Sequence, residues 1–457
     1  MFQNLIISNE LSLYKFFKQL NFDLYLTKPQ LEHLEGTMTA MILKGFNGKV
    51  SDIAELASKR HRTSITRFLS KSNWDENLLI NALKSKVIEL IWNKSEKSQK
   101  PIYLIIDDTI SEKTKPSSKA INPIEKCYFH NSHLKRKTVY GHQLVVALLS
   151  CDGLVLPYSI EIYDKSNMSK IDIATKLIKS MPKPVNKGYI LCDSWYSCKA
   201  IFKASALAGY AYIGALKTNR VIYPKGHERL GIKLHKSMPK PVNKGYILCD
   251  SWYSCKAIFK ASALAGYAYI GALKTNRVIY PKGHERLGIK LHKFATSLNK
   301  DSFDLVKVKG KHYYIYNYIG HLNDMKNVSI ILSYPKESFQ KEGSLKAFIS
   351  TDLVLKPLDI LFKYTDRWVI EPFFRDCKNY LGLDSYQVKS ERSILRYLTI
   401  MFITYTYCKL YSSKTLQFNT GLKLAKNNFK KAQIIFIYSA ALNGQPIEKI
   451  FENLKIA

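Results

Sequence analysis

Apolar residues recur with the helical period through residues 1–95, which predicts a mainly helical N-terminal region. Within it, residues 51–69 predict two short helices around a basic turn, with Ser51 as the N-cap of the first. Two interpretations stay open, a helix-turn-helix that reads DNA and an ordinary helical hairpin with a solvated turn. The two expected apolar faces carry Ile53, Leu56 and Ala57, then Ile65, Phe68 and Leu69.

Continuous apolar runs in the next part of the chain predict buried strands. The first run ends in acid, so we expect Asp107 and Asp108 at the C-terminal end of a strand. The turn Cys151-Asp-Gly153 separates the other two runs, and a helix is expected at about 168–178. The three predicted strands cover 101–109, 139–149 and 154–162.

A perfect tandem duplication follows: residues 179–235 (copy one) are repeated without change as residues 236–292 (copy two). Each copy predicts a strand, a helix and a second strand. Solenoid repeats drift in sequence and need at least three units, so identity over 57 residues indicates a recent duplication or an error of sequence assembly.

The remaining chain predicts three further segments. Alternation of apolar and polar residues from 294 to about 355 predicts a mainly β segment. Residues 364–378 predict one helix, which Pro372 would kink. The C-terminal part predicts basic helices, and its most apolar stretch, 394–407, is too short for a membrane span and predicts a buried helix.

The excess of basic over acidic residues indicates what kind of partner the chain binds. The chain has 70 Lys and Arg against 36 acidic residues, a net charge of +34, which indicates a polyanion, most simply nucleic acid. The charge is spread along the whole chain, so a membrane surface is the weaker alternative. Its 8 Cys form no CxxC pair, and the N-terminus lacks a signal-peptide pattern, so we expect no zinc site, no disulfide framework and a reducing cytoplasm.

Carboxylates recur at three places where a sheet and a helix could bring them together. These are Asp107 with Asp108, Asp193 with its repeat Asp250, and Glu371. Oxygen ligands of this kind suit Mg²⁺ or Mn²⁺, and such ions can activate a nucleophile against a phosphodiester. Each Asp alone reads more simply as a turn or cap residue, and Glu371 alone as part of a solvated helix face.

Four residues would share one face of the helix at 364–378. On an ideal helix Tyr364, Arg367, Glu371 and Lys378 fall within an arc of about 60°. Arg367 and Lys378 would neutralise phosphates beside the carboxylate.

These residues carry a resemblance. The spacing Tyr-x2-Arg-x3-Glu-x6-Lys matches the YREK signature of a class of bacterial insertion-sequence transposases, and the order of Asp108, Asp193 or Asp250, and Glu371 resembles their DDE triad. The resemblance implies an α/β fold: a ribonuclease-H-like mixed sheet with flanking helices, a β-rich insertion before the catalytic Glu helix, and helical N- and C-terminal regions. In that family the Asp directly before Thr is catalytic, which favours Asp108 over Asp107.

The resemblance also implies the residue roles and the reaction. Asp108, Asp193 or Asp250, and Glu371 would hold Mg²⁺ or Mn²⁺, and Tyr364, Arg367 and Lys378 would contact the DNA end. Metal-activated water would nick double-stranded DNA at terminal inverted repeats, and the freed 3′-hydroxyl would attack the other strand or the target, usually within a homodimer. The expected location is the bacterial cytoplasm, at the nucleoid.

The expected domains combine these segments. The chain divides into a helical DNA-binding region (1–95), the first part of the catalytic core with the duplication (100–292), the β-rich insertion (293–356), the Glu helix of the core (357–392) and a helical C-terminal region (393–457).

The duplication leaves alternatives open. One site needs one second Asp, and we favour Asp250 because copy two keeps its exit helix, 289–298, unbroken. The surplus copy would then lie outside the sheet with exposed apolar strands, and activity would be impaired. The alternatives to an active transposase are a non-catalytic DNA-binding remnant and a nuclease of the same fold.

Overall fold

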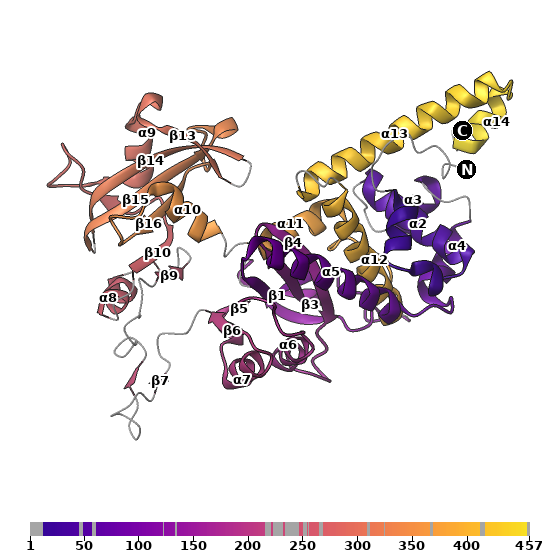
Figure 1. Cartoon of the computed structure of the whole chain (residues 1–457), viewed down its shortest axis with the longest axis horizontal. Coiled ribbons are helices and arrows are strands. Elements are labelled where there is room, and N and C mark those ends of the chain that lie inside the picture. The colour runs from indigo at the N-terminus through magenta and orange to yellow at the C-terminus, as the bar shows by residue number, and fades with distance from the viewer. Residues whose placement is uncertain are drawn as a thin grey trace. The chain divides into compact units, whose positions relative to one another are not determined.

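The computed structural model describes residues 12–44, 49–56, 61–121, 123–132, 135–214, 221–222, 232–233, 246–249, 254, 256–264, 268–308, 311–323, 325–365, 369–411 and 416–454. The fold is mixed α/β, with two large sheets and many helices (Figure 1). The chain forms two compact units, a first unit of Met1–Gly214 with Ile370–Ala457 and a second unit of Ala215–Val369. Within the described ranges, no helix is long and apolar enough to cross a membrane.

Helices dominate the N-terminal part of the first unit, which confirms the prediction. They are α1 (Leu13–Gln19), η2 (Phe22–Leu24), α2 (Lys28–Lys44), α3 (Val50–Leu56), α4 (Arg62–Ser70) and α5 (Glu76–Ser98). Ile53, Ile65 and Phe68 are buried as expected. Ser51 is not an N-cap, because α3 already begins at Val50; Ala57 lies outside the described residues.

The sheet of the first unit is built around β1. Its strands are β1 (Ile102–Glu112), β2 (Tyr128–Ser132), β3 (Lys137–Cys151), β4 (Leu154–Ile162), β5 (Gly188–Cys192) and β6 (Ala211–Gly214), in the order β2-β3-β1-β5-β6 with β4 on β3. β1 runs antiparallel to β3 and parallel to β5. Asp107 and Asp108 therefore lie inside β1 and not at its end, because β3 continues the pairing as far as Glu112.

Local sequence explains two connections in this sheet. Asp152 and Gly153 both have positive φ, +45° and +82°, as a two-residue hairpin between twisted strands requires. After β4, Ser169 and Asp172 form a reciprocal capping box that begins α6 (Lys170–Lys179).

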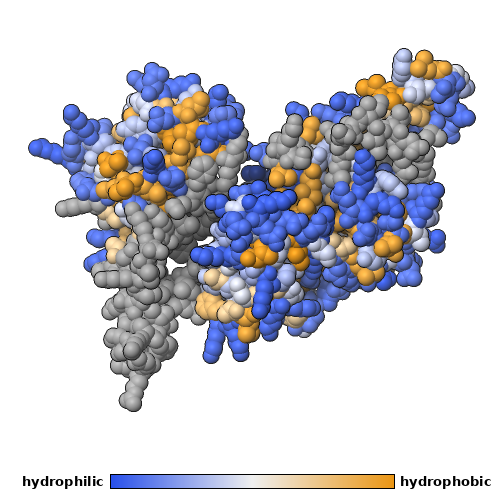
Figure 2. Space-filling view, in the orientation of Figure 1, coloured by the Kyte–Doolittle hydropathy of each residue, from blue (hydrophilic) through white to orange (hydrophobic). Residues whose placement is uncertain are grey.

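Helices cover the sheet of the first unit. α5 and α12 (Glu391–Leu410) contact β4, and α6 packs against α7 (Lys199–Leu207). α12 is buried along most of its length, which confirms the buried helix predicted over 394–407. α11 (Ile370–Tyr380), α13 (Phe418–Leu442) and α14 (Ile447–Leu454) complete the unit. Figure 2 shows hydrophilic side chains over much of the visible face, with hydrophobic ones between them. Leu442 at the end of α13 and Ile447 at the start of α14 are exposed.

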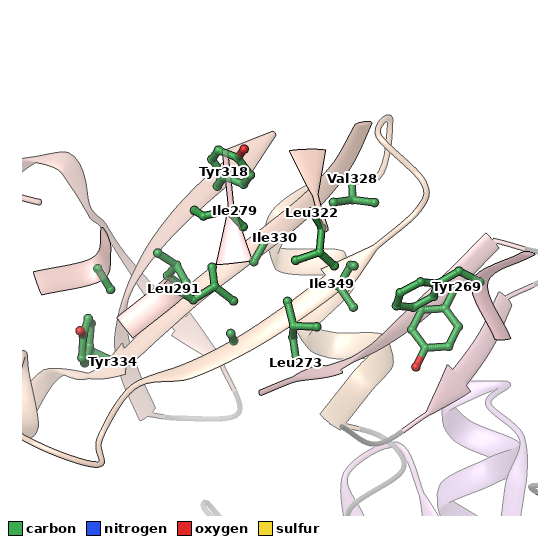
Figure 3. Packing of buried hydrophobic residues seen from close by; sticks show 14 of the residues in the cluster. Tyr269, Leu273, Ile279, Leu291, Tyr318, Leu322, Val328, Ile330, Tyr334 and Ile349 are labelled. Carbon is green, nitrogen blue, oxygen red and sulfur yellow. The ribbon is translucent and has the colours of Figure 1, made fainter. Parts of the chain in front are cut away.

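The second unit contains an eight-stranded sheet, which confirms the predicted β segment. Its strand order is β12-β11-β14-β15-β16-β10-β9, with β13 on β14. One face packs the cluster in Figure 3, which includes Tyr269, Leu273, Leu291 and Ile349, and α10 covers the other. The elements are β7 (Val221–Ile222), β8 (Ile232–Lys233), β9 (Tyr246–Cys249), α8 (Lys256–Leu264), β10 (Ala268–Leu273), β11 (Val278–Ile279), β12 (Ile289–Lys290), α9 (Leu291–Ser297), η5 (Lys300–Ser302), β13 (Asp304–Val308), β14 (Lys311–Leu322), β15 (Met325–Pro335), η6 (Lys336–Ser338), β16 (Lys346–Ser350) and α10 (Pro357–Thr365).

The duplicated segment is divided between the two units. Copy one contributes β5, α7 and β6 to the sheet around β1, whereas copy two contributes β9, α8 and β10 to the second sheet. The expectation that copy two fills the place beside β1 is therefore wrong. The surplus copy is also not left outside a sheet, because the edge of β16 accepts β10.

The helix predicted over 364–378 is two helices. α10 ends at Thr365 in the second unit, and α11 begins at Ile370 in the first. Pro372 lies in the first turn of α11, where a missing N–H costs nothing, so it does not kink a longer helix. The prediction that Tyr364 shares one helix face with Glu371 and Lys378 is wrong, because Tyr364 belongs to α10 and the other two to α11. Arg367 lies outside the described residues. Glu371 and Lys378 remain together on α11, about two turns apart.

Candidate active site

Asp107 and Asp108 of β1, Asp193 directly after β5 and Glu371 of α11 are the acidic residues of the candidate site in the first unit. The pairing of β1 with β5 ends at Ile106 and Cys192, so Asp107 and Asp193 are the next residues of the two strands. Burial, and then the negative charges of Asp108, Asp193 and Glu371, raise the pKa of Asp107 to about 8. The charges of Asp108, Asp193 and Glu371 therefore act on Asp107, whereas Asp250 lies outside the described residues.

Three donors hold the carboxylate of Asp108. Lys170 Nζ and Tyr196 OH donate to Oδ1 at 3.0 and 2.9 Å, and Gln143 Nε2 donates to Oδ2 at 2.5 Å. Successive strand residues point to opposite faces of a sheet, so Asp107 faces away from these donors. Its Oδ1 accepts the backbone N–H of Asp108 at 2.8 Å. The two aspartates therefore have different partners, although they are neighbours in sequence.

The sequence analysis missed the donors to Asp108. Lys170 is the first residue of α6, directly after the capping residue Ser169, and Tyr196 lies in the turn after Asp193. A Tyr three residues beyond a candidate Asp was the available signal. Burial and the charge of Asp108 raise the pKa of Tyr196, so its hydroxyl stays a donor.

Lys378 fixes the helix that carries Glu371. Its Nζ donates to the carbonyl of Ile110 on β1 at 3.1 Å and pairs with Asp384 at 3.3 Å. Two more hydrogen bonds hold the segment that follows α11. Ser111 Oγ on β1 donates to the carbonyl of Leu383 at 2.9 Å. Lys113 Nζ, directly after β1, donates to the carbonyl of Asp384 at 2.9 Å. Lys378 thus has a structural partner at the site where the sequence predicts a phosphate contact.

The donor set suits a hard divalent cation in type. Carboxylate oxygens are the ligands that Mg²⁺ and Mn²⁺ prefer. Burial is the largest cause of the raised pKa of Asp107, and a cation would offset the smaller contribution from neighbouring negative charges. Among the described residues, no three acidic, histidine or cysteine side chains lie close enough together to form a metal-binding group.

His130 on β2 is a buried base beside this site. Burial, and then the charge of Lys165, lower its pKa to about 4. Its ring contacts those of Tyr128 and Tyr163, at centroid distances of 6.4 and 6.2 Å.

Acid should weaken the fold through His130. Between its ordinary pKa of 6.5 and about 4, the unfolded chain binds a proton that the folded chain does not. The free energy of unfolding should therefore fall as the pH falls through this window, by up to about 3 kcal/mol. Phenylalanine keeps the ring contacts but cannot titrate. We expect urea unfolding of the wild type and of His130→Phe to converge or cross as the pH is lowered; a pH-independent difference would contradict this.

Comparisons with known proteins give one sequence match. Residues 228–407 match the family model described as the transposase DDE domain. The matched region is less than half of the chain; it contains Asp250, Tyr364, Arg367, Glu371 and Lys378, and it begins after Asp108 and Asp193. No curated protein matches the chain.

Two solved structures are similar at a low level. The first is a cryo-EM structure of the piggyBac transposase synaptic complex with hairpin DNA, 12% identical, which covers 94% of this chain and 70% of that chain with a TM-score of 0.34. The second is a crystal structure of the Mos1 strand transfer complex, 8% identical, which covers 46% of this chain and 60% of that chain with a TM-score of 0.15. Scores this low define neither the fold nor the function of this chain.

Proposed function

We propose that this chain is a DNA transposase that cuts DNA at the ends of an insertion sequence and joins the freed ends to a target. One observation carries the proposal: a chain that matches the transposase DDE domain over 228–407 places Asp193, directly after β5, and Glu371 of α11 where their charges act on Asp107 of β1. Metal-dependent phosphodiester chemistry uses carboxylate ligands of this kind, and a net charge of +34 suits a DNA substrate.

The proposed catalytic core has a ribonuclease-H-like arrangement. The order of antiparallel β3, β1 and parallel β5 in the first unit supports it, and the second unit corresponds to a β-rich insertion before α11. In this proposal the N-terminal helices, 1–95, contribute DNA binding, and residues 393–457 form a helical C-terminal region that follows the core.

Asp108, Asp193 and Glu371 are the proposed ligands of Mg²⁺ or Mn²⁺. The metal, when bound, supplies Lewis-acid activation of the attacking oxygen and stabilises the leaving one. Lys170 and Tyr196 orient the Asp108 carboxylate, and the contact between Lys378 and β1 positions Glu371. Asp250 is the duplicate of Asp193, and Tyr364, Arg367 and Lys378 are the proposed DNA-end contacts.

A DNA cleavage and joining assay tests the proposal. The full chain would be incubated with Mg²⁺ and a linear duplex that carries the sequence flanking its gene, together with a supercoiled target. We expect cut ends and joined products, and pairing of two ends predicts a homodimer in the active complex. Cutting without joining would indicate a nuclease instead.

A non-catalytic DNA-binding protein is the second candidate. It is favoured by the three donors that already occupy both oxygens of Asp108, and by the division of the duplicated segment between two sheets. Retention of end-bearing duplex in a mobility-shift assay, with no metal-dependent cutting, would support this candidate against the transposase.

A further inference from the structure

We infer that the duplicated segment is a docking module with two separate faces, and that the face of copy one formed by β6 and Phe202 fits the β16 edge of the second unit. The inference does not depend on the proposed function. It rests on one sequence observed in two surroundings.

The two copies have the same internal structure. In copy one, β5 and β6 pair in parallel with Tyr189 beside Ala211, and in copy two β9 and β10 pair with Tyr246 beside Ala268, the same register. The rings of Phe202 and Tyr212 lie 4.8 Å apart, and those of their repeats, Phe259 and Tyr269, lie 4.7 Å apart. A serine bonds the tyrosine hydroxyl in both copies, at 2.8 Å from Ser197 and 2.9 Å from Ser254. The module is therefore preserved, whatever it docks against.

The copies use opposite edges of this module. Copy one pairs its first strand, β5, with β1, and β6 is the last described strand of that sheet. Copy two pairs its second strand, β10, with β16, and β9 is the last described strand of its sheet. The edge that is paired in one copy is thus the terminal edge in the other.

Burial of the matched helices follows the same division. Phe202 on α7 is 38% exposed, whereas its repeat Phe259 on α8 is 1% exposed and packs in the core cluster with Leu273 and Leu291 (Figure 3 shows that cluster). Ile201 is 0% exposed in copy one, whereas its repeat Ile258 is only partly buried. The phenylalanine is accessible in copy one and buried in copy two, whereas the isoleucine is buried in copy one and only partly buried in copy two.

A single copy of the module could pair with both sheets at the same time. The partners occupy opposite edges, so a single copy can pair with β1 through its first strand and with β16 through its second. The result is one continuous sheet in the order β1, first strand, second strand, β16. In the full chain copy two occupies β16. Among the described residues, no strand pairs with the outer edge of β6, and the exposed Phe202 lies against Tyr212 of that strand.

Deleting one copy tests the inference, and deletion of 179–235 or of 236–292 gives the same sequence. Hydrogen exchange would be followed at the amides of β6, residues 211–214. We expect at least a hundredfold slower exchange in the shortened chain, where these amides pair with β16. Unchanged exchange would overturn the inference. So would failure of the shortened chain to fold, because one module would then not serve both sheets.

A matched pair of substitutions gives a second readout in the full chain. Phe259→Ala should lower the Tm of the second unit by on the order of 10 °C, and Phe202→Ala should lower Tm by less than about 3 °C. In the shortened chain the single remaining Phe should become as sensitive as Phe259. Equal effects of the two substitutions in the full chain, or a tolerant Phe in the shortened one, would contradict the two-face assignment.

Discussion

Replacing Asp108 by asparagine should reduce Mg²⁺-dependent cutting of end-bearing DNA by a hundredfold or more. Loss of an outer partner of a metal site costs roughly 10- to 100-fold, so loss of a charged ligand should cost at least the upper value. Asparagine keeps the size of the side chain and can still accept the bond from Tyr196 at Oδ1. The measurement is single-turnover cutting as a function of Mg²⁺ concentration, with DNA retention measured in parallel.

Asp107→Asn is the matched control for this prediction. Asp107 is its neighbour on β1 but points to the opposite face, and its carboxylate is crowded by like charges. With a pKa of about 8 this carboxyl is largely protonated near neutral pH, so a neutral asparagine of the same size should leave cutting within about tenfold of the wild type. The reverse result, inactive Asp107→Asn with active Asp108→Asn, would move the β1 ligand to Asp107. Two unaffected variants would remove β1 from the site.

Replacing Arg396 by methionine should destabilise the first unit by about 3–5 kcal/mol. The guanidinium is fully buried and joins α12 to the end of α4 and the start of α5. It bonds Glu76 at 3.0 Å, and its carbon lies 4.3 Å from the centre of the Trp74 ring. It also donates to the carbonyls of Phe68, Leu69, Ser72 and Trp74. Methionine fills the volume but leaves Glu76 and these carbonyls without their donor.

Urea unfolding measures this effect, and Arg392 on the same helix provides the control. Arg392 is exposed, so Arg392→Met should change the free energy of unfolding by less than about 0.5 kcal/mol. Equal midpoints for the two variants would show that the buried network adds no stability. A selective loss at Arg396 would identify α12 as the support of α4, the helix that the sequence offers as a DNA reader.

Local patterns predicted most elements of the fold. The helical N-terminal region, the strands on either side of Asp152 and Gly153, and the buried α12 follow from periodicity and turn chemistry, which neighbouring residues determine. The sequence also identified an acid at the end of each of two apolar runs, but it did not identify which copy pairs with β1, because the two copies are identical.

Non-local pairing accounts for what the sequence could not predict. The antiparallel partner β3 extends β1 past Asp108, and no local signal reports the length of a partner strand. The periodicity between Tyr364 and Lys378 is unbroken, yet α10 and α11 pack in different units, so tertiary contacts override it. Gln143 and Lys170 reach Asp108 from β3 and α6, far away in sequence.

The docking of copy one beside β1 has a consequence for the order of events on the ribosome. At about 5–20 residues per second, β5 leaves the tunnel roughly 3–11 s before its identical repeat β9, because 57 residues separate them. Strand pairing is complete within microseconds to seconds. Copy one therefore meets a finished β1 before its repeat has been made, and vectorial synthesis favours copy one at this position. When the complete chain refolds after dilution from denaturant, both copies are present from the beginning. Either copy can then be the first to pair with β1.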